Sequence, residues 1–316
     1  MKRYRIDNWA EYNASLINRG RLTIWMSSSA IEGWFAENRG HDPGRPRVYS
    51  DDAILMMLML RERYHLPLRA VQGFVESAFE QIGIDLPVPS YTQICRRAKR
   101  LGELLKRLIR RGGATDLVFD STGLRVYGEG EWKVRTHGKS KRRTWRKLHI
   151  AIDPTSQQIV LAELTDRDGG DSAIGAEMLD EIKGQLGHVW GDGGYDGVSF
   201  RQAVFKRCGQ LIVPPPKNAR YKGATHGCER KRDASIAEIV GLGGDEAARK
   251  LWKKLKGYHR RSLVETAMYR IKQILGGNLR ARCPSNQTVE SLLKCFIINK
   301  MSDLGLPRGR WVELAG

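Results

Sequence analysis

The order of apolar segments between residues 113 and 217 constrains the fold more than any other feature of this sequence. Residues 117–119 predict a short buried strand that ends at Asp120, and two alternating apolar segments at 147–153 and 157–166 predict two more strands. A basic hairpin region joins the first two strands and a short turn joins the last two. We therefore expect an antiparallel meander.

A helix, a strand, a second helix and a further strand follow, at residues 168–187, 188–190, 197–207 and 210–217. Asp171 and Asp196 stand at the starts of the two helices, where a short acidic side chain can accept from free backbone amides. This is the element order of an RNase H-like fold, a mixed sheet flanked by helices. Its central strands are neighbours, so Asp120 and Asp192 are expected to lie close together at one edge.

Residues 1–112 predict an all-α domain. Ser90 is the expected N-cap of a helix over residues 91–111, which begins with polar and basic side chains that include Arg96 and Arg97. A short helix, a turn and a helix of this kind are how a helix-turn-helix presents its reading element to DNA. An all-helical dimerisation domain with a basic surface explains the same pattern.

The charge of the chain is strongly unbalanced. It has 54 Lys and Arg against 35 Asp and Glu, a formal net charge of +19. Such an excess indicates a polyanionic partner, most commonly DNA or RNA, although a ribosome-associated or merely basic protein is the alternative. The densest basic segments are residues 217–232 and a hairpin region that includes Lys141, Arg142 and Arg143. We expect them to contact DNA phosphates, while solvated surface loops have the same composition.

Other features exclude several classes of protein. The five cysteines form no CxxC pair, so neither a disulfide framework nor a zinc site is expected. Apolar segments are too short for a membrane span or a signal core, which predicts a cytoplasmic, nucleoid-associated protein without membrane contact. GxSxG, Walker and HExxH motifs are absent from the sequence.

Residues 258–272 predict a helix with a mixed polar stripe. At about 100° per residue, Tyr258, Arg261, Glu265 and Lys272 fall within roughly 60° of one another and share one side. An ordinary solvent-exposed helix face, stabilised by pairs of opposite charges, would show the same pattern of residues.

The two aspartates favour a functional interpretation of Glu265 over a purely structural one. In an RNase H-like fold this late helix lies over the sheet edge that carries Asp120 and Asp192. Three carboxylates in one pocket repel one another. Two Mg²⁺ ions, which prefer oxygen ligands and substrate phosphates, resolve that conflict. The three residues are therefore predicted to be the metal ligands of a phosphodiester-cleaving site.

Three motifs now carry a resemblance to a known family: VFDSTG at Asp120, GDGGYD at Asp192, and a Y-x2-R-x3-E-x6-K spacing from Tyr258 to Lys272. Over essentially its whole length the chain resembles the DDE transposases of bacterial insertion sequences. Within them it resembles the branch with the Tyr-Arg-Glu-Lys signature, and there the IS-five group.

The resemblance implies an RNase H-like core in which Asp120, Asp192 and Glu265 bind Mg²⁺ or Mn²⁺, two ions per active site. It also implies an enzyme that nicks the ends of its own element and joins the freed 3′-hydroxyls to target DNA. The terminal inverted repeats and the target DNA are then its partners, and joining both ends in one complex requires at least a homodimer. The residues implied to hold phosphates of the terminal nucleotides are Tyr258, Arg261 and Lys272.

The expected domain plan is a helical DNA-binding domain at 1–112, a catalytic domain at 113–305 with a small basic insertion at about 217–256, and a tail at 306–316. Two alternative functions would explain the same basic surface. One is a non-catalytic DNA-binding regulator, and the other is an RNase H-like structure-selective nuclease that cuts without joining.

Overall fold

The computed structural model describes residues 2–37, 48–110, 112–113, 115–126 and 145–313. The chain divides into two compact units, Lys106–Cys295 and a second unit made of Met1–Leu105 with Phe296–Gly316. The expected plan assigned residues up to 305 to the catalytic domain, whereas residues from Phe296 onward group with the N-terminal unit. A strand near each end of the chain explains this grouping, because the two pair with each other.

A mixed sheet forms the centre of Lys106–Cys295. Its strands in order across the sheet are β4 (Ile159–Asp166), β3 (Trp145–Ile152), β2 (Leu117–Val126), β5 (His188–Trp190) and β6 (Gln210–Ile212). The strands β2, β3 and β4 pair antiparallel, while β5 and β6 run parallel to β2. The predicted antiparallel meander and the mixed sheet flanked by helices are thus confirmed.

The strand β2 is longer than predicted, and Asp120 lies inside it rather than at its end. The ladder with β3 continues past Asp120, from Val118 opposite Ile152 to Arg125 opposite Trp145. On its other edge β2 pairs with β5 only at its first two residues, and with the short strand β7 (Asn278–Leu279) only at its last two. Among the described strands, therefore, none pairs with the middle of that edge, where Asp120 lies.

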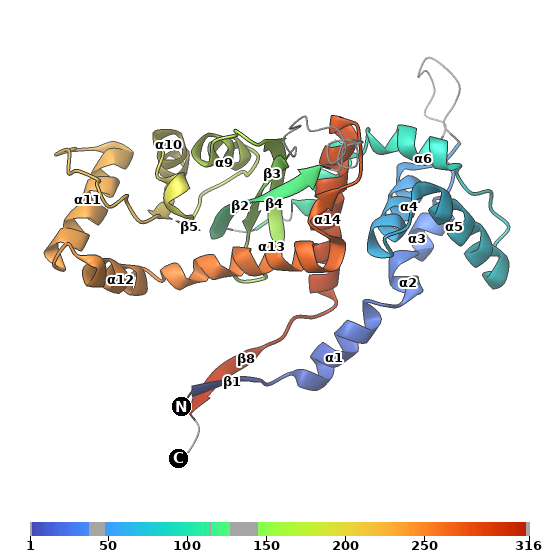
Figure 1. The fold of residues 1–316 in the computed structure, drawn as a ribbon, viewed down its shortest axis with the longest axis horizontal. Helices are drawn as coiled ribbons and strands as arrows, with labels where there is room; N and C mark the ends of the chain where they lie inside the picture. Colours follow the sequence, from blue (N-terminus) through green and yellow to red (C-terminus); the bar gives the residue numbers. More distant parts are fainter. Residues whose placement is uncertain (1, 38–47, 111, 114, 127–144, 314–316) are drawn as a thin grey trace, which may run out of the picture. The chain divides into compact units, whose positions relative to one another are not determined.

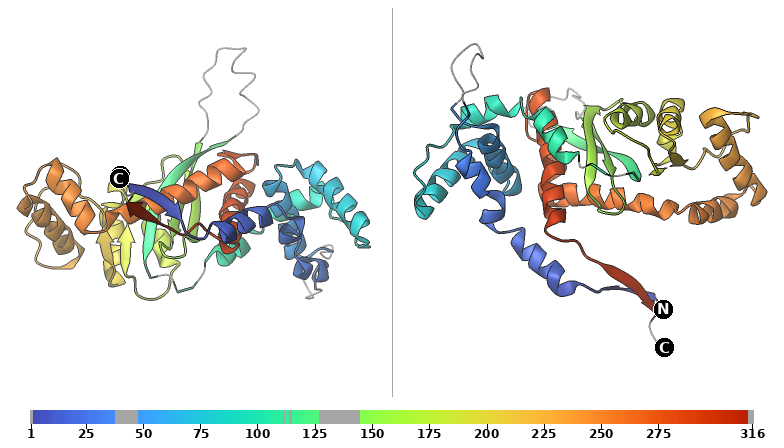
Figure 2. Two further views of the ribbon diagram at one scale, coloured as in Figure 1. Left: turned by 90° about the horizontal axis from the view of Figure 1, so that it is seen from below. Right: turned by 180° about the vertical axis from the view of Figure 1, so that it is seen from behind.

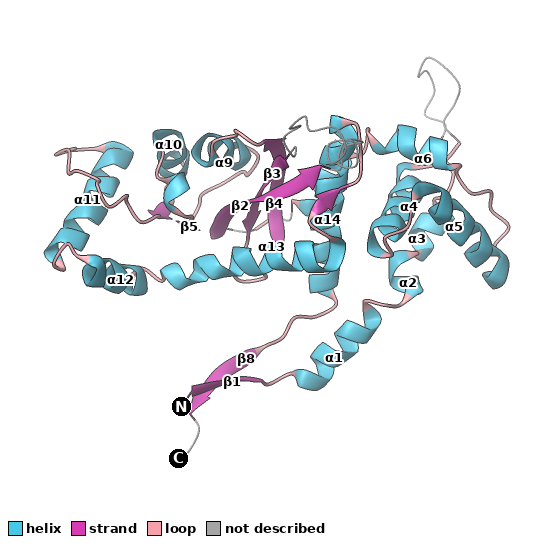
Figure 3. Ribbon diagram, viewed as in Figure 1, coloured by secondary structure: helices cyan, strands magenta, loops and turns pink. Residues whose placement is uncertain are grey.

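Helices cover both faces of the sheet. Figure 1 shows α9 (Asp171–Asp180) and α10 (Val198–Lys206) on one side and α13 (Ser262–Leu275) on the other; the same layers stand out by element type in Figure 3. Phe119 anchors the first of these layers, with its ring 5.0 Å from that of Phe200 and 5.8 Å from that of Tyr195. Gly175 of α9 allows this close packing, since a Cβ there would lie 2.8 Å from the Phe200 ring.

Two predicted helix caps are wrong. The N-cap residues of α9 and α10 are Gly170 and Gly197, and neither Asp171 nor Asp196 serves as the cap. Both aspartates are half-buried and pair with cationic side chains instead. A charged partner in a partly buried place stabilises a carboxylate more than an amide at an exposed helix end does. The helix predicted at 168–187 is also shorter, and ends at Asp180.

The segment between β6 and the sheet-covering helix α13 is helical. It contains α11 (Gly227–Gly241) and α12 (Glu246–Leu255). The single helix predicted over 258–272 is in fact two elements, the 3₁₀ helix η2 (Tyr258–Arg261) followed by α13. Gly257, with a positive φ of 64°, turns the chain into η2. The even 100° spacing assumed for Tyr258 and Arg261 is therefore wrong, because 3₁₀ residues advance by a larger angle.

The other unit is built around α4 (Asp51–Arg63), whose residues 53–60 are all buried. The helices that precede it in the chain are α1 (Trp9–Asn18), α2 (Leu22–Trp25) and α3 (Ser28–Glu32), and those that follow are α5 (Leu68–Ile82) and α6 (Tyr91–Ala98). Ser90 caps α6 as predicted, and with Gln93 it forms a capping box.

The helix predicted over 91–111 is broken into α6 and α7 (Gly102–Ile109). Turn-type bonds from the amides of Arg100 and Leu101 to the carbonyls of Arg97 and Ala98 end α6, just before Gly102, a poor helix former. Unpredicted strands β1 (Lys2–Ile6) and β8 (Gly309–Glu313) pair antiparallel, so the two chain ends lie side by side (Figure 2). In the described part of the chain, no helix combines the length and apolarity that a membrane span requires.

The aromatic packing under β2 gives a test of the core. Replacing Phe119 with Ala should lower the free energy of unfolding by about 3–5 kcal/mol, because it removes a fully buried ring and leaves a cavity. The exposed Tyr269 on α13 supplies the control, since Tyr269→Ala should change it by no more than about 0.5 kcal/mol. Chemical denaturation measures both, and equal losses would show that Phe119 does not anchor this layer.

Candidate active site

Asp120 lies on the unpaired middle of the β2 edge and is only 9% exposed. One carboxylate oxygen accepts from the backbone amide of Ser121 at 2.8 Å. The other accepts from a guanidinium nitrogen of Arg261 at 3.0 Å. A carboxylate buried to this degree needs such partners, because burial without them strongly disfavours its charge.

Asp192 reaches the same edge from β5. That strand pairs with the start of β2 and ends at Trp190, so the chain emerges beside the unpaired stretch. Asp192 then caps the 3₁₀ helix η1 (Gly193–Tyr195), accepting from the amide of Gly194 at 2.8 Å. The predicted position of Asp192, just past a strand end and between glycines, is as observed.

Glu265 comes from the first turn of α13, which packs on β2 and β3. Its carboxylate lies 2.6 Å from the second terminal nitrogen of Arg261, four residues earlier. One guanidinium therefore bridges Glu265 and Asp120. Glu265 is the most exposed of the three carboxylates, with 53% of its side chain accessible.

The charges of these groups act on one another. Burial raises the pKa of Asp120; the Ser121 amide and Arg261 oppose that rise, while Asp192 and Glu265 add to it. Burial also raises the pKa of the Tyr258 phenol, with further contributions from Asp192, Asp120 and Glu265. Tyr258, Arg261 and the three carboxylates of Asp120, Asp192 and Glu265 thus share one electrostatic environment.

The donor set suits a hard divalent cation. Carboxylate oxygens are the ligands that Mg²⁺ and Mn²⁺ prefer, and a buried Asp120 beside two further carboxylates gains from added positive charge. In the described residues no three acidic, His or Cys side chains already stand together as a metal cluster. The guanidinium of Arg261 lies between Asp120 and Glu265, at 3.0 Å and 2.6 Å from their carboxylates.

The other predicted contact residues lie elsewhere. Lys272 is exposed, about two turns beyond Glu265 on α13. In the N-terminal unit Arg96 is exposed on α6, whereas Arg97 is half-buried and donates to the Tyr49 carbonyl at 2.8 Å and to Asp51 at 2.5 Å. The basic residues Lys141, Arg142 and Arg143 lie outside the described residues.

A second cluster beside the carboxylates was missed from the sequence. Asp171 accepts from Lys147 at 2.9 Å and lies 3.4 Å from the fully buried His149. Burial alone would raise the pKa of Asp171, but the neighbouring side chains of His149, Lys147 and Ser121 more than offset this and hold the pKa far below its usual value. Ser121 follows Asp120 directly, so the cluster braces the strand at the site. Its signal was two polar side chains two residues apart on an otherwise apolar strand.

Comparison with known proteins identifies the family of this chain. A family model described as a transposase DDE domain matches residues 111–300, more than half of the chain, and another of the same description matches residues 17–129. The chain belongs to the DDE transposase family, which confirms the resemblance at that level, and its enzyme class is that of a transposase. A cryo-EM structure of a piggyBac transposase synaptic complex with hairpin DNA has 8% identity and a TM-score of 0.42, covering 94% of this chain and 76% of that one.

The position of Arg261 leads to a prediction about metal binding. Replacing Arg261 with Gln removes the cation that competes for Asp120 and Glu265, so affinity for Mn²⁺ without DNA should rise roughly tenfold, an effect of about 1.4 kcal/mol. Isothermal titration calorimetry measures it.

The neighbouring Arg260 is exposed and provides a charge-matched control, so Arg260→Gln should leave the Mn²⁺ affinity unchanged. An unchanged or weaker affinity in Arg261→Gln would mean that the guanidinium does not compete with the metal.

Proposed function

We propose that this protein is the transposase of an insertion sequence. It binds the ends of its element, hydrolyses phosphodiester bonds there and transfers the freed strands into target DNA. The single observation that carries the proposal is the contact of the Arg261 guanidinium with both Asp120 and Glu265 beside the unpaired edge of β2, in a chain that belongs to the DDE transposase family. The nearby charge of Asp192 adds to the rise in the pKa of Asp120. The net charge of +19 supports DNA as the partner.

We infer that the catalytic unit is RNase H-like. The support is its strand order β4-β3-β2-β5-β6, with an antiparallel meander followed by two parallel strands. Membership of the IS-five group with the Tyr-Arg-Glu-Lys signature is supported by the shared environment of Tyr258, Arg261 and Glu265 around Asp120. Lys272, the last residue of that signature, is exposed and thus accessible to DNA.

In this proposal Asp120, Asp192 and Glu265 hold two Mg²⁺ or Mn²⁺ ions. When bound, such ions supply an activated water or 3′-hydroxyl and stabilise the departing oxygen. The chain's own residues bind and orient the DNA strand. Arg261 and Lys272 bring positive charge to the substrate phosphates, and Tyr258, half-buried beside the carboxylates, offers a protonated hydroxyl as donor.

The N-terminal unit is proposed to recognise the element ends, as a helical domain at about 1–112. Four residues separate α4 from α5, while eight separate α5 from α6. The recognition helix of a helix-turn-helix follows its turn, so the proposed motif is α5, the eight-residue connection and α6, with α6 as the basic helix at the DNA. Joining two ends in one complex requires a homodimer on DNA, located at the nucleoid in the cytoplasm.

The carboxylates give the direct test of this function. Asp120→Asn, Asp192→Asn and Glu265→Gln should each lower cleavage of DNA that carries the element ends by at least about 10³-fold with Mg²⁺, because each removes a metal-binding charge. Binding of the same DNA, measured by fluorescence anisotropy, should persist. Gel analysis of nicked and joined products measures the reaction.

Asp166→Asn is the matched control, since the Asp166 side chain is 93% exposed, and it should cut normally. Normal cleavage by any of the three site variants would remove that residue from the proposed site. Cleavage by the unaltered protein without any joined product would favour the structure-selective nuclease.

Two adjacent arginines on α6 separate DNA contact from folding. Arg96→Gln should weaken end binding and reduce the slope of log affinity against log salt by about 0.9, since one phosphate contact is lost. Arg97→Gln should instead lower the thermal stability, because Arg97 bonds to the Tyr49 carbonyl and to Asp51. Salt-dependent binding and thermal unfolding distinguish the two, and an unchanged salt slope in Arg96→Gln would move DNA contact away from α6.

A further inference from the structure

The loop that carries Asp192 has little conformational restraint of its own. Residues 191–197 contain four glycines, and glycine leaves the backbone more conformations than any other residue. The three other residues are Asp192 itself, Tyr195 and Asp196. The position of the Asp192 carboxylate therefore depends on how Tyr195 and Asp196 are held.

Tyr195 holds the loop from the inside of the domain. It is 1% exposed, and its ring lies 5.8 Å from that of Phe119 and 5.1 Å from that of Phe200. This contact fixes one point of the loop against the core. At the start of the loop β5 ends at Trp190 and Asp192 caps η1, so a contact at Asp196 restrains the other end of the loop, which leads into α10.

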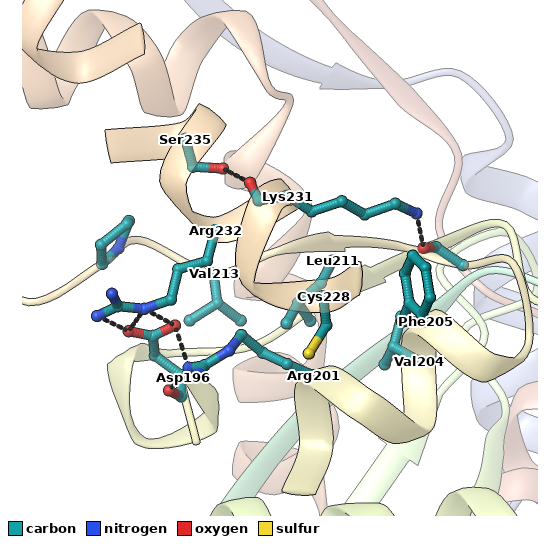
Figure 4. A pocket seen from close by; sticks show the side chains of 12 residues that line it. Asp196, Arg201, Val204, Phe205, Leu211, Val213, Cys228, Lys231, Arg232 and Ser235 are labelled. Carbon is teal, nitrogen blue, oxygen red and sulfur yellow. Dashed lines mark hydrogen bonds and ion pairs between the residues drawn. The ribbon is translucent and has the colours of Figure 1, made fainter. Parts of the chain in front are cut away.

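Asp196 supplies the second point, through helix α11 of the segment after β6. Figure 4 shows the Asp196 carboxylate in direct contact with the guanidinium of Arg232, at a pocket lined by residues of α10, β6 and α11. Arg232 contacts both carboxylate oxygens, with Nε 3.0 Å from Oδ2 and 3.2 Å from Oδ1 and a terminal nitrogen 2.9 Å from Oδ2. The Asp196 side chain is only 7% exposed, and a planar guanidinium on a buried carboxylate fixes orientation as well as distance.

Arg201 of α10 completes the connection. Its guanidinium lies 3.0 Å from the Asp196 carboxylate and 2.6 Å from that of Glu229 on α11, and it also donates to the Asp196 carbonyl. Two arginines and two acids thus form a charge-balanced, largely buried network. Because removal of one member leaves a buried charge unpaired, the network behaves as a unit.

The network also reaches the basic surface. Asp233, the neighbour of Arg232 on α11, is 2% exposed and accepts from the backbone amides of Lys222 at 3.1 Å and Ala224 at 2.9 Å. Lys222 itself is exposed, in the basic segment 217–232. Direct contacts therefore run from this segment through α11 to the loop of Asp192.

We propose that Arg232 is a positioning residue for Asp192. Through the two contacts of the Arg232 guanidinium with Asp196, helix α11 of the segment 217–256 holds the catalytic loop in place. The segment is then a structural part of the active site in addition to any DNA contact it makes. The inference rests on the proposed role of Asp192 as a catalytic carboxylate.

The test compares full-length Arg232→Gln with the unaltered protein. Amide hydrogen exchange of a peptide that covers residues 191–197 should be faster in the variant without metal or DNA. Mn²⁺ affinity by calorimetry and the cleavage rate at saturating DNA should each fall about tenfold, as is usual when a group that orients a metal ligand is removed. DNA affinity should change by less than about twofold, because the Arg232 side chain is only 13% exposed and its guanidinium is held by Asp196.

Lys206→Gln, at an exposed site on α10, is the charge-matched control and should match the unaltered protein in every measurement. Arg232→Lys keeps the positive charge but loses the two-point contact of the guanidinium with Asp196. Amide hydrogen exchange at residues 191–197 in this variant should therefore be faster than in the unaltered protein and slower than in Arg232→Gln. This variant also provides the test if Arg232→Gln does not fold. Exchange and Mn²⁺ affinity equal to the unaltered protein in either folded variant would overturn the proposal.

The two proposals fail in different ways. If the unaltered protein cuts no DNA, the proposed function fails, while faster exchange at 191–197 in Arg232→Gln still establishes that α11 holds the loop. If the unaltered protein cuts DNA and Arg232→Gln cuts equally well, the positioning role fails and the function stands.

Discussion

Three carboxylates drawn from distant parts of the chain repel one another, and the guanidinium of Arg261 offsets part of their charge. It lies 3.0 Å from Asp120 and 2.6 Å from Glu265. In the proposed function, metal ions and Arg261 compete for the carboxylates, whereas DNA phosphates bind to Arg261 and to the metal ions. The state of the site therefore depends on which of them is bound.

The sheet provides the place where these charges meet. Because β5 pairs only with the start of β2 and β7 only with its end, the middle of that edge is left for side chains rather than for a neighbouring strand. Asp120 occupies this stretch, the chain leaving β5 brings Asp192, and α13 brings Glu265 from the face of the sheet. Rigid strands and a packed helix fix two of these groups, while the Asp192 loop needs anchors of its own.

Pairs of buried charges do much of the remaining positioning. Asp171 with Lys147 braces the strand next to Asp120, and Asp196 with Arg232 holds the loop after Asp192. Both acids were predicted as helix caps. That expectation used only neighbours in sequence, whereas the cations that bind these carboxylates lie 24 and 36 residues away. The rule for helix caps considers only hydrogen bonds between the aspartate and nearby backbone amides. It takes no account of a guanidinium or ammonium group that is distant in sequence but close in the folded chain.

Much of the fold could be predicted because its signals are local. Alternating apolar residues predicted the meander, and Ser90 predicted the start of α6. Elements whose limits depend on distant partners were predicted less well: β2 extends past Asp120 because β3 continues to pair with it, and β1 and β8 form only because the two chain ends meet.

The sequence by itself determined the order of strands and helices, the excess of positive charge, and which acids stand at Asp120, Asp192 and Glu265. Those properties follow directly from the local periodicity and the composition of the sequence. Only the tertiary structure decided that Arg261 bridges two of the acids, that Arg97 is tied to Asp51 while Arg96 stays exposed, and that α11 holds the Asp192 loop. Each of these is a choice among many possible charged partners, and it is made by distance and burial, which exist only once the chain has folded.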